Sequence, residues 1–188
     1  ELRKAGCQET VLEMAPVLMG RQLDAAAGQM LKEISESQGI EIRTGVQIEA
    51  IEGGAEAEGV KLSDGAVIPA ELVVISAGVR ANAALAKDAG IDTDRAVIVN
   101  ERMETSLPDI YACGDCAQYE GVNLGIWPQA VEEGTVAGAQ AAGDKDAVYK
   151  PVSAALSFNG MNTSLFAAGD NGKQPELIYK TVEFRDPA

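Results

Sequence analysis

The apolar residues in the first part of the chain predict an amphipathic helix over residues 23–38. They recur at intervals that place them on one face of a helix: Leu23, Ala27, Met30, Leu31 and Ile34. Gly39 follows directly and is typical of a residue that ends a helix. Residues 1–6 have the pattern of the last turns of another helix, and residues 82–89 predict a third helix, closed by Gly90.

Short runs of β-branched and other apolar residues predict strands. One is expected at residues 9–13, and a meander of four is expected at residues 40–43, 46–51, 60–62 and 66–68. Ser63-Asp64-Gly65 supplies a hairpin turn. Residues 72–76 are an unbroken apolar run, typical of a strand covered on both faces in a parallel sheet. With a further strand at residues 97–100, the pattern predicts an α/β fold.

Residues 105–116 lead a short apolar segment into a Gly-Asp turn. Residues 110–112 predict a short buried strand, and Gly114 gives a ligand close access to the backbone. Asp115 supplies oxygens that accept hydrogen bonds from ligand hydroxyl groups. Gly and Asp also dominate ordinary turns, so the residues that follow decide between the two interpretations.

An Ala- and Gly-rich helix is predicted to begin within residues 125–134, with Pro128 in its first turn. Such a helix start favours negative charge through its free N–H groups and its dipole. Together with the Gly-Asp turn, this stretch resembles the second FAD-binding motif of the pyridine nucleotide-disulfide oxidoreductase superfamily. The resemblance implies that Gly114 and Asp115 hold the ribityl chain of FAD and that Gln129 and Ala130 face its ring.

Glu13 ends the predicted strand at residues 9–13, where a dinucleotide-binding fold places its ribose-binding acid. In that role its charge favours NAD over NADP, although Arg21 could weaken the preference. An exposed acid at a strand end is the alternative interpretation. Gly78 is expected either to admit the dinucleotide or simply to end a strand. The chain has no G-x-G-x-x-G sequence, so this fingerprint is expected upstream of residue 1.

The resemblance divides the chain into three parts. Residues 1–78 resemble a Rossmann-like nicotinamide domain, N-terminally incomplete, that contains the antiparallel meander. Residues 79–144 resemble the returning C-terminal part of an FAD domain. Residues 145–188 resemble the start of the α+β C-terminal domain of rubredoxin reductases and nitrite reductase flavoproteins. We therefore expect an internal or C-terminal fragment that lacks the N-terminal flavin segment.

Composition and charge exclude several function classes. The chain has 188 residues, 46% of them hydrophobic, and no apolar run approaches the ~18 residues of a membrane helix. A cytoplasmic protein without membrane contact is expected. The net charge of −14 repels a phosphate backbone and disfavours nucleic-acid binding. The chain has no histidine, which excludes a Ser-His-Asp triad and, with only one C-x-x-C, disfavours a metal site.

The three cysteines do not form a disulfide framework. Cys113 and Cys116 make a C-x-x-C, for which a redox dithiol is the alternative to two residues of the flavin turn. Cys7 is expected to be a small core residue.

The resemblance implies hydride transfer from NADH to FAD and then electron transfer to a small redox protein, a disulfide or oxygen. No catalytic acid or nucleophile can be named, and rubredoxin reductase, NADH oxidase and coenzyme A disulfide reductase types stay open. The fragment alone is expected to bind FAD and NAD weakly, to be inactive, and to expose apolar surfaces that favour a homodimer. The alternative is a non-enzymatic α/β module whose acidic surface binds a protein partner.

Overall fold

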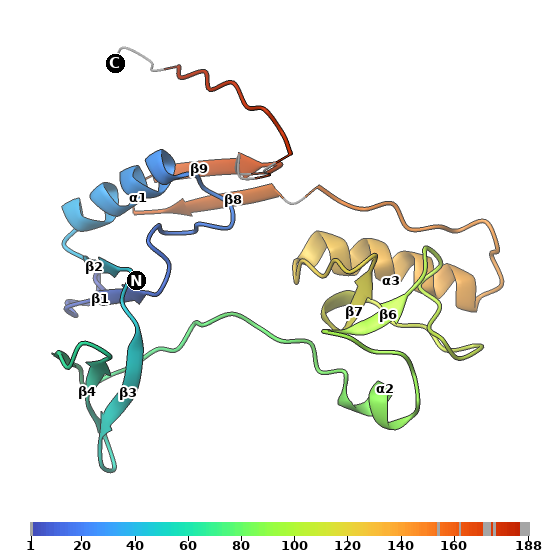
Figure 1. The fold of residues 1–188 in the computed structure, drawn as a ribbon, viewed down its shortest axis with the longest axis horizontal. Coiled ribbons are helices and arrows are strands. Elements are labelled where there is room, and N and C mark those ends of the chain that lie inside the picture. Colours follow the sequence, from blue (N-terminus) through green and yellow to red (C-terminus); the bar gives the residue numbers. More distant parts are fainter. Residues whose placement is uncertain (1, 154, 162, 171–173, 175, 185–188) are drawn as a thin grey trace. The chain divides into compact units, whose positions relative to one another are not determined.

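The chain forms two compact units in the computed structural model (Figure 1). The first unit combines Glu1–Ile75 with Ala155–Ala188, and the second unit is Ser76–Ala154. The structure describes residues 2–153, 155–161, 163–170, 174 and 176–184. The three-part division expected from the sequence stays a prediction.

A parallel β-α-β arrangement begins the first unit. β1 (Thr10–Glu13) pairs in parallel with β2 (Glu41–Thr44), and α1 (Ala25–Ser37) connects them. Asp24 caps α1, because its Oδ1 atom accepts the Ala27 N–H at 2.8 Å. The predicted strands and helix are confirmed in this region.

The buried face of α1 carries Gly28, Leu31 and Ser35. A Cβ atom at Gly28 would collide with the Val17 side chain, so α1 lies directly against the loop that follows β1. Met30 is 61% exposed and does not belong to the buried face as predicted. One residue corresponds to about 100° of helix rotation, which turns Met30 away from the side that Leu31 occupies.

An antiparallel meander follows in the first unit. It consists of β3 (Ile48–Gly53), β4 (Ala57–Leu62) and β5 (Val67–Pro69). In the turn between β4 and β5, Asp64 Oδ1 accepts the Ala66 N–H at 2.9 Å, and Gly65 has φ +89°. The predicted meander has three strands instead of four, because the strand expected at residues 40–43 is β2, which pairs in parallel with β1. The hairpin turn and the other three strands are confirmed, with bounds shifted by a few residues.

A second hairpin also belongs to the first unit. β8 (Ala155–Gly160) pairs antiparallel with β9 (Thr163–Ala168), and exposed positions alternate with half-buried ones along both strands. The Ser35 hydroxyl of α1 donates to Met161 Sδ at 2.9 Å.

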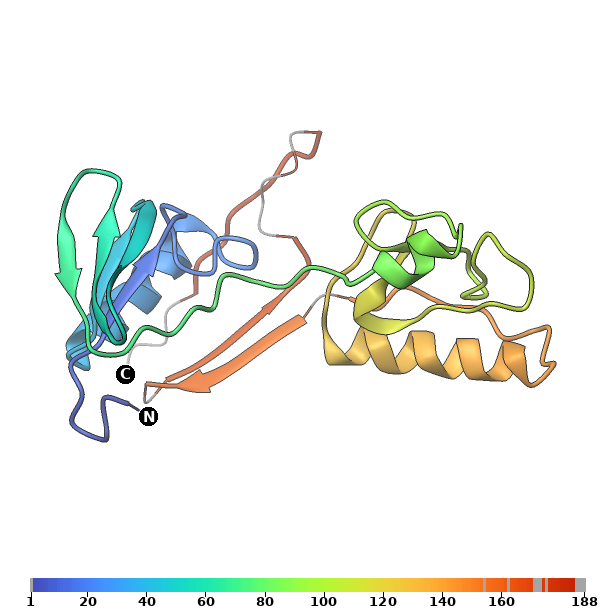
Figure 2. The same ribbon diagram turned by 90° about the horizontal axis from the view of Figure 1, so that it is seen from below.

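A parallel strand pair beside a long helix forms the second unit. β6 (Val97–Val99) pairs with β7 (Ala117–Tyr119), and α3 (Trp127–Ala141) lies beside them (Figures 1 and 2). Their shared core consists of Ile91, Val97, Val99, Met103, Ala117, Val136, Ala137 and Tyr149. The strand at residues 97–100 and the Pro128 helix are confirmed, whereas the helix at residues 82–89 is the shorter α2 (Ala84–Asp88). Across the described residues, every helix is too short or too polar to cross a membrane.

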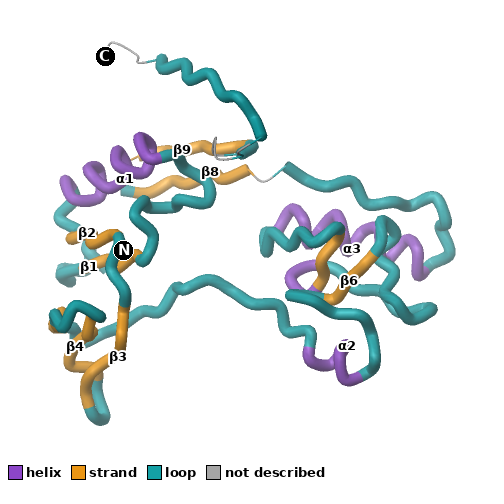
Figure 3. The backbone as a smooth tube through the Cα atoms, viewed as in Figure 1, coloured by secondary structure: helices purple, strands orange, loops and turns teal. Residues whose placement is uncertain are grey.

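Residues 72–76 do not form the predicted buried strand. The segment between β5 and α2 is loop (Figure 3), and Leu72, Val74 and Ile75 are 67%, 70% and 73% exposed. A strand needs a hydrogen-bonded neighbour for its backbone, and no described strand pairs with this segment. Its apolar side chains therefore lie in solvent.

Three shorter predictions are also wrong. Residues 2–6 form turns, because so short a segment does not repay helix nucleation. Residues 110–112 contain only an isolated bridge between Tyr111 and Glu104, and Ile110 is 40% exposed. Asp109 has φ +61°, which interrupts the extended conformation just before this segment. Cys7 is exposed, since it follows the terminal turns and does not reach the core.

Candidate functional site

The Gly-Asp turn of the second unit is a short 3-10 turn, Gly114–Cys116, that leads directly into β7. Gly114 has φ +73°. A Cβ atom at Gly114 would lie 3.5 Å from Ala130 Cβ, which is ordinary contact, so the backbone conformation rather than space requires glycine. The structure thus brings the turn against the first turns of α3.

Glu133 connects α3 to this turn. Its side chain is completely buried; Oε2 accepts the Gly114 N–H at 2.7 Å and Oε1 accepts the Gln129 side-chain amide at 2.8 Å. Burial raises the pKa of the Glu133 carboxyl, and the two hydrogen bonds do not cancel this effect. The negative charge of Asp115 raises the pKa further.

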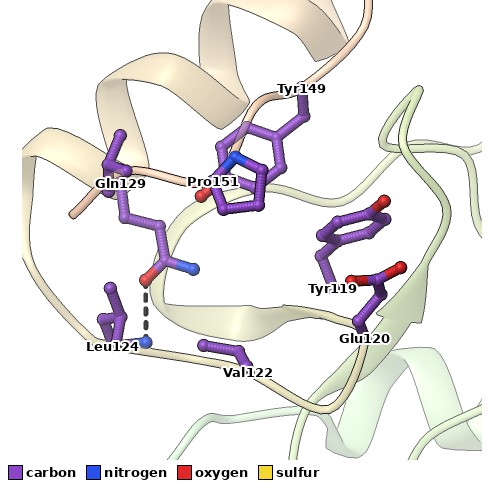
Figure 4. Close-up of a pocket in the computed structure, with 8 residues that line it drawn as sticks. Tyr119, Glu120, Val122, Leu124, Gln129, Tyr149 and Pro151 are labelled. Carbon is purple, nitrogen blue, oxygen red and sulfur yellow. Dashed lines mark hydrogen bonds between the residues drawn. The ribbon is translucent and has the colours of Figure 1, made fainter. Parts of the chain in front are cut away.

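Gln129 lies in the first turn of α3 and binds the segment before the helix through its side chain. It is 3% exposed, and its Oε1 atom accepts the Leu124 backbone N–H at 2.7 Å (Figure 4). Since its amide nitrogen donates to Glu133, the Gln129 side chain is committed to partners within the protein. For a ligand, Gln129 is therefore left with its backbone N–H in the first turn of the helix, and its place beside a flavin ring stays a prediction.

Asn123 fixes the other side of the turn. Its Nδ2 atom donates to the backbone oxygens of Asp115 at 2.9 Å and of Ala117 at 2.7 Å. The Asp115 side chain is exposed. The backbone of the turn is thus held from two sides, while its one carboxylate faces solvent.

Sequence reasoning missed Glu133 and Asn123. For Glu133 a signal exists, because Gln129, Glu133 and Gln140 follow the spacing of the buried face of α3. Polar residues at such positions need hydrogen-bond partners inside the protein. For Asn123 the loop sequence holds no comparable signal.

A small cavity lies next to this network (Figure 4). Its volume is about 70 Å³, and it is lined by Tyr119, Glu120, Val122, Leu124, Gln129, Tyr149, Pro151 and Val152. Sites for drug-sized ligands and cofactors usually measure about 300–1,000 Å³, so a dinucleotide does not fit into this cavity. The exposed surface at Asp115 is the better candidate.

Glu13 and Gly78, the predicted nicotinamide-cofactor residues, belong to different units. Glu13 is half-buried at the end of β1, where its Oε1 atom accepts the Ala15 N–H at 2.7 Å. Gly78 is exposed and has φ +86°, which favours glycine.

The three cysteines are free. Cys116 Sγ lies 3.3 Å from the Cys113 carbonyl oxygen, and both side chains are half-buried. Burial raises the pKa of the Cys113 thiol, with smaller effects from Cys116 and Glu133. A raised pKa keeps the thiol protonated and a poor nucleophile, which disfavours the redox-dithiol interpretation. The described residues contain no group of three or more His, Cys, Asp or Glu that could hold a metal ion.

Comparison with known proteins assigns this arrangement to a family. Residues 1–141 match the family model described as pyridine nucleotide-disulphide oxidoreductase. The chain belongs to this family. The matched range contains every predicted site residue, and the resemblance inferred from the Gly-Asp turn is confirmed.

The chain is similar to parts of several reductases. Nitrite reductase [NAD(P)H] of Bacillus subtilis (strain 168) is 35% identical over 98% of the chain and 23% of its own length. NADH-rubredoxin oxidoreductase of Clostridium acetobutylicum is 32% identical over 87% of the chain and 40% of its own length. The chain therefore spans less than half of either relative.

A solved structure supports the α/β fold. The FAD-dependent pyridine nucleotide-disulphide oxidoreductase of Desulfovibrio vulgaris superposes with a TM-score of 0.81 at 31% identity. The match covers 88% of this chain and 44% of that protein. The predicted Rossmann-like α/β class is confirmed.

Proposed function

We propose that the chain is part of an FAD-dependent NADH:acceptor oxidoreductase and that its second unit contributes the Gly114 and Asp115 contacts to FAD. The observation that carries the proposal is the turn itself: Glu133 and Asn123 hold its backbone while the Asp115 carboxylate is exposed. A fixed backbone beside an exposed acceptor is what a ligand contact needs, which supports this role for the turn.

The residues present fit FAD. Gly114 adopts a left-handed conformation without a side chain to block the backbone, and Asp115 offers acceptors for ribityl hydroxyl groups. The first turn of α3 offers the Gln129 N–H group and a helix dipole that favour negative charge on a reduced ring. Ala130 donates its own N–H to the Ile126 carbonyl oxygen at 3.2 Å, so its proposed contact with the ring is made by its small side chain. Bound FAD would supply the capacity to accept hydride and to release electrons to an acceptor.

Glu13 and Gly78 are the proposed contacts to the nicotinamide cofactor. Glu13 ends β1 of a parallel β-α-β arrangement, the position of the ribose-binding acid in dinucleotide folds. A carboxylate there repels the additional phosphate of NADP, so NADH is the preferred donor. In the full-length protein, E13Q should reduce the preference for NADH over NADPH, whereas E9Q, earlier in the same segment, should leave it unchanged.

The relatives suggest the acceptor. One relative is named NADH-rubredoxin oxidoreductase, and another is named nitrite reductase [NAD(P)H]. We propose a small redox protein as the acceptor class, with a disulfide or oxygen as alternatives. We propose a soluble, cytoplasmic location for this reaction.

The chain alone should bind FAD and NAD weakly and be inactive. The exposed apolar run at Leu72, Val74 and Ile75 supports this, because a strand of a dinucleotide domain is normally covered by further strands and helices. We propose that a segment containing the glycine fingerprint and the first flavin motif supplies that cover. A homodimer of the chain would cover the same side chains.

The decisive experiment records the visible spectrum of the protein in its natural full-length form, before and after NADH is added without oxygen. Flavin absorbance that bleaches with NADH supports the proposal, and a colourless, unresponsive protein contradicts it. D115A should weaken FAD binding by about ten- to a hundredfold, the effect of one charged hydrogen-bonding group. D146A removes an exposed carboxylate elsewhere in the same unit and should bind FAD normally.

A further inference from the structure

Glu133 is a buried acid that the proposed function leaves unused. Its side chain is completely buried, and the described part of the chain shows no lysine or arginine in an ion pair with it. An unpaired buried carboxylate is costly. Its position between the Gly-Asp turn and the start of α3 therefore calls for a reason other than stability.

The hydrogen bonds of Glu133 form a chain across the site. The Gly114 N–H donates to one oxygen and the Gln129 amide donates to the other, while Gln129 itself accepts the Leu124 N–H. Both oxygens of Glu133 accept, which matches an ionised carboxylate. A protonated carboxyl group has to donate its own O–H and loses one of these acceptor positions.

The Gln129 amide cannot easily supply the acceptor that a protonated Glu133 would need. Rotating that amide would turn its nitrogen towards the Leu124 N–H and leave two donors facing each other. The Gly114 backbone N–H likewise has no acceptor to offer, so a proton on either oxygen of Glu133 opposes a donor, and a proton on Oε2 weakens the Gly114 bond. Gly114 is also the residue that carries the left-handed conformation of the turn.

The charges around Glu133 favour proton uptake. Asp115 belongs to the turn and Cys113 directly precedes it, while Tyr149 follows α3 and Glu132 is the neighbour of Glu133 within α3. Asp115 raises the pKa of Glu133, and Glu133 in turn raises the pKa of Cys113 and Tyr149. None of these groups is a cation that would hold Glu133 ionised.

We propose that Glu133 is a proton-linked positioning residue: its carboxylate holds the Gly114 amide so that the Gly114–Asp115 turn can receive FAD, and uptake of one proton from solvent releases that amide and weakens FAD binding. The flavin half of this inference rests on the proposed function. The link between Glu133 and Gly114 does not.

The first test follows the backbone amide of Gly114 by NMR in the 188-residue chain from about pH 4 to pH 8, a range that begins near the ordinary carboxyl pKa of about 4 and extends above it, where a raised pKa is expected. The Gly114 resonance should move with a single-proton curve whose midpoint equals that of the Glu133 carboxyl carbon. E133Q should abolish the movement, and E132Q, which removes the exposed neighbouring acid, should retain it. A Gly114 resonance that does not follow the Glu133 carboxyl overturns the proposal. This comparison within the unmodified chain decides the question even if E133Q does not fold.

The second test measures FAD dissociation constants at several pH values with the natural full-length protein. Below the midpoint, the affinity should fall with pH by up to about tenfold per pH unit, because one proton opposes productive binding. E132Q should show the same slope, and E133Q should show none. A pH-independent affinity in the unmodified protein overturns the flavin half. Absence of FAD binding at every pH refutes the proposed function instead, and the NMR result then stands separately.

Discussion

The Glu133 carboxylate accepts the Gly114 N–H at 2.7 Å, although the two residues are 19 positions apart and belong to different elements. This bond joins a residue whose conformation only glycine readily adopts to a side chain that is completely buried. The shape of the turn is therefore set by the interior of α3 as much as by its own sequence.

Replacing Gly114 with alanine should destabilise the protein through backbone strain alone. The new Cβ atom meets only ordinary contact distance to Ala130, but φ +73° costs a non-glycine residue about 1–2 kcal/mol. Chemical denaturation measures the loss. G138A is the matched control, because Gly138 is exposed within α3 with free space around it and should gain about 0.5–1 kcal/mol. Equal effects of the two substitutions would contradict the assignment of strain.

Glu133 should make stability depend on pH. Burial raises the pKa of the Glu133 carboxyl in the folded state above its unfolded value, so the folded state binds the proton more tightly. The resulting contribution to the free energy of unfolding is fully present below the pKa of the unfolded state and is lost as pH rises through the pKa of the folded state. The free energy of unfolding of the unmodified protein should fall relative to that of E133Q across this window and then level off. The free energy of unfolding of the unmodified protein relative to that of E132Q should not show this fall. A free energy of unfolding that instead rises with pH relative to that of E133Q would contradict the prediction.

Asn123 should stabilise the folded state through the hydrogen bonds that its Nδ2 atom donates. N123A removes the two bonds to Asp115 and Ala117 oxygens and should cost about 1–2 kcal/mol. N123D keeps the shape but points a carboxylate at two carbonyl oxygens, so it should cost more than N123A at neutral pH. Denaturation of both variants under the same conditions checks the order. The reverse order would mean that Asn123 acts by packing.

The exposed apolar run should affect association rather than folding. V74K changes a side chain that is 70% exposed and should alter the free energy of unfolding by no more than about 0.5 kcal/mol. Sedimentation velocity should show less self-association of V74K than of the unmodified chain. V60A, at a buried position of β4, should instead destabilise the fold by about 1–3 kcal/mol without reducing association. If V74K self-associates as strongly as the unmodified chain, Val74 does not contribute to a dimer contact.

Local signals explain which elements the sequence predicts correctly. Asp24 caps α1 within three residues, and Pro128 fits the first turn of α3, so both helices carry their own start signals. The run at residues 72–76 fails because the burial of a strand depends on neighbours that its own sequence does not contain. Glu133 escapes notice for a similar reason, since its partner Gly114 is distant in sequence and close only after folding.

The contact between Gly28 and Val17 makes the order of substitutions matter. A methyl group at position 28 collides with the Val17 side chain and lies 3.0 Å from the Leu18 carbonyl oxygen. Gly28→Ala is therefore harmful while valine occupies position 17, and becomes much less so once a smaller residue stands there. The two sites are therefore epistatic: the cost of a methyl group at position 28 depends on the size of the residue at position 17, and the tight contact with the Leu18 carbonyl oxygen remains in either background.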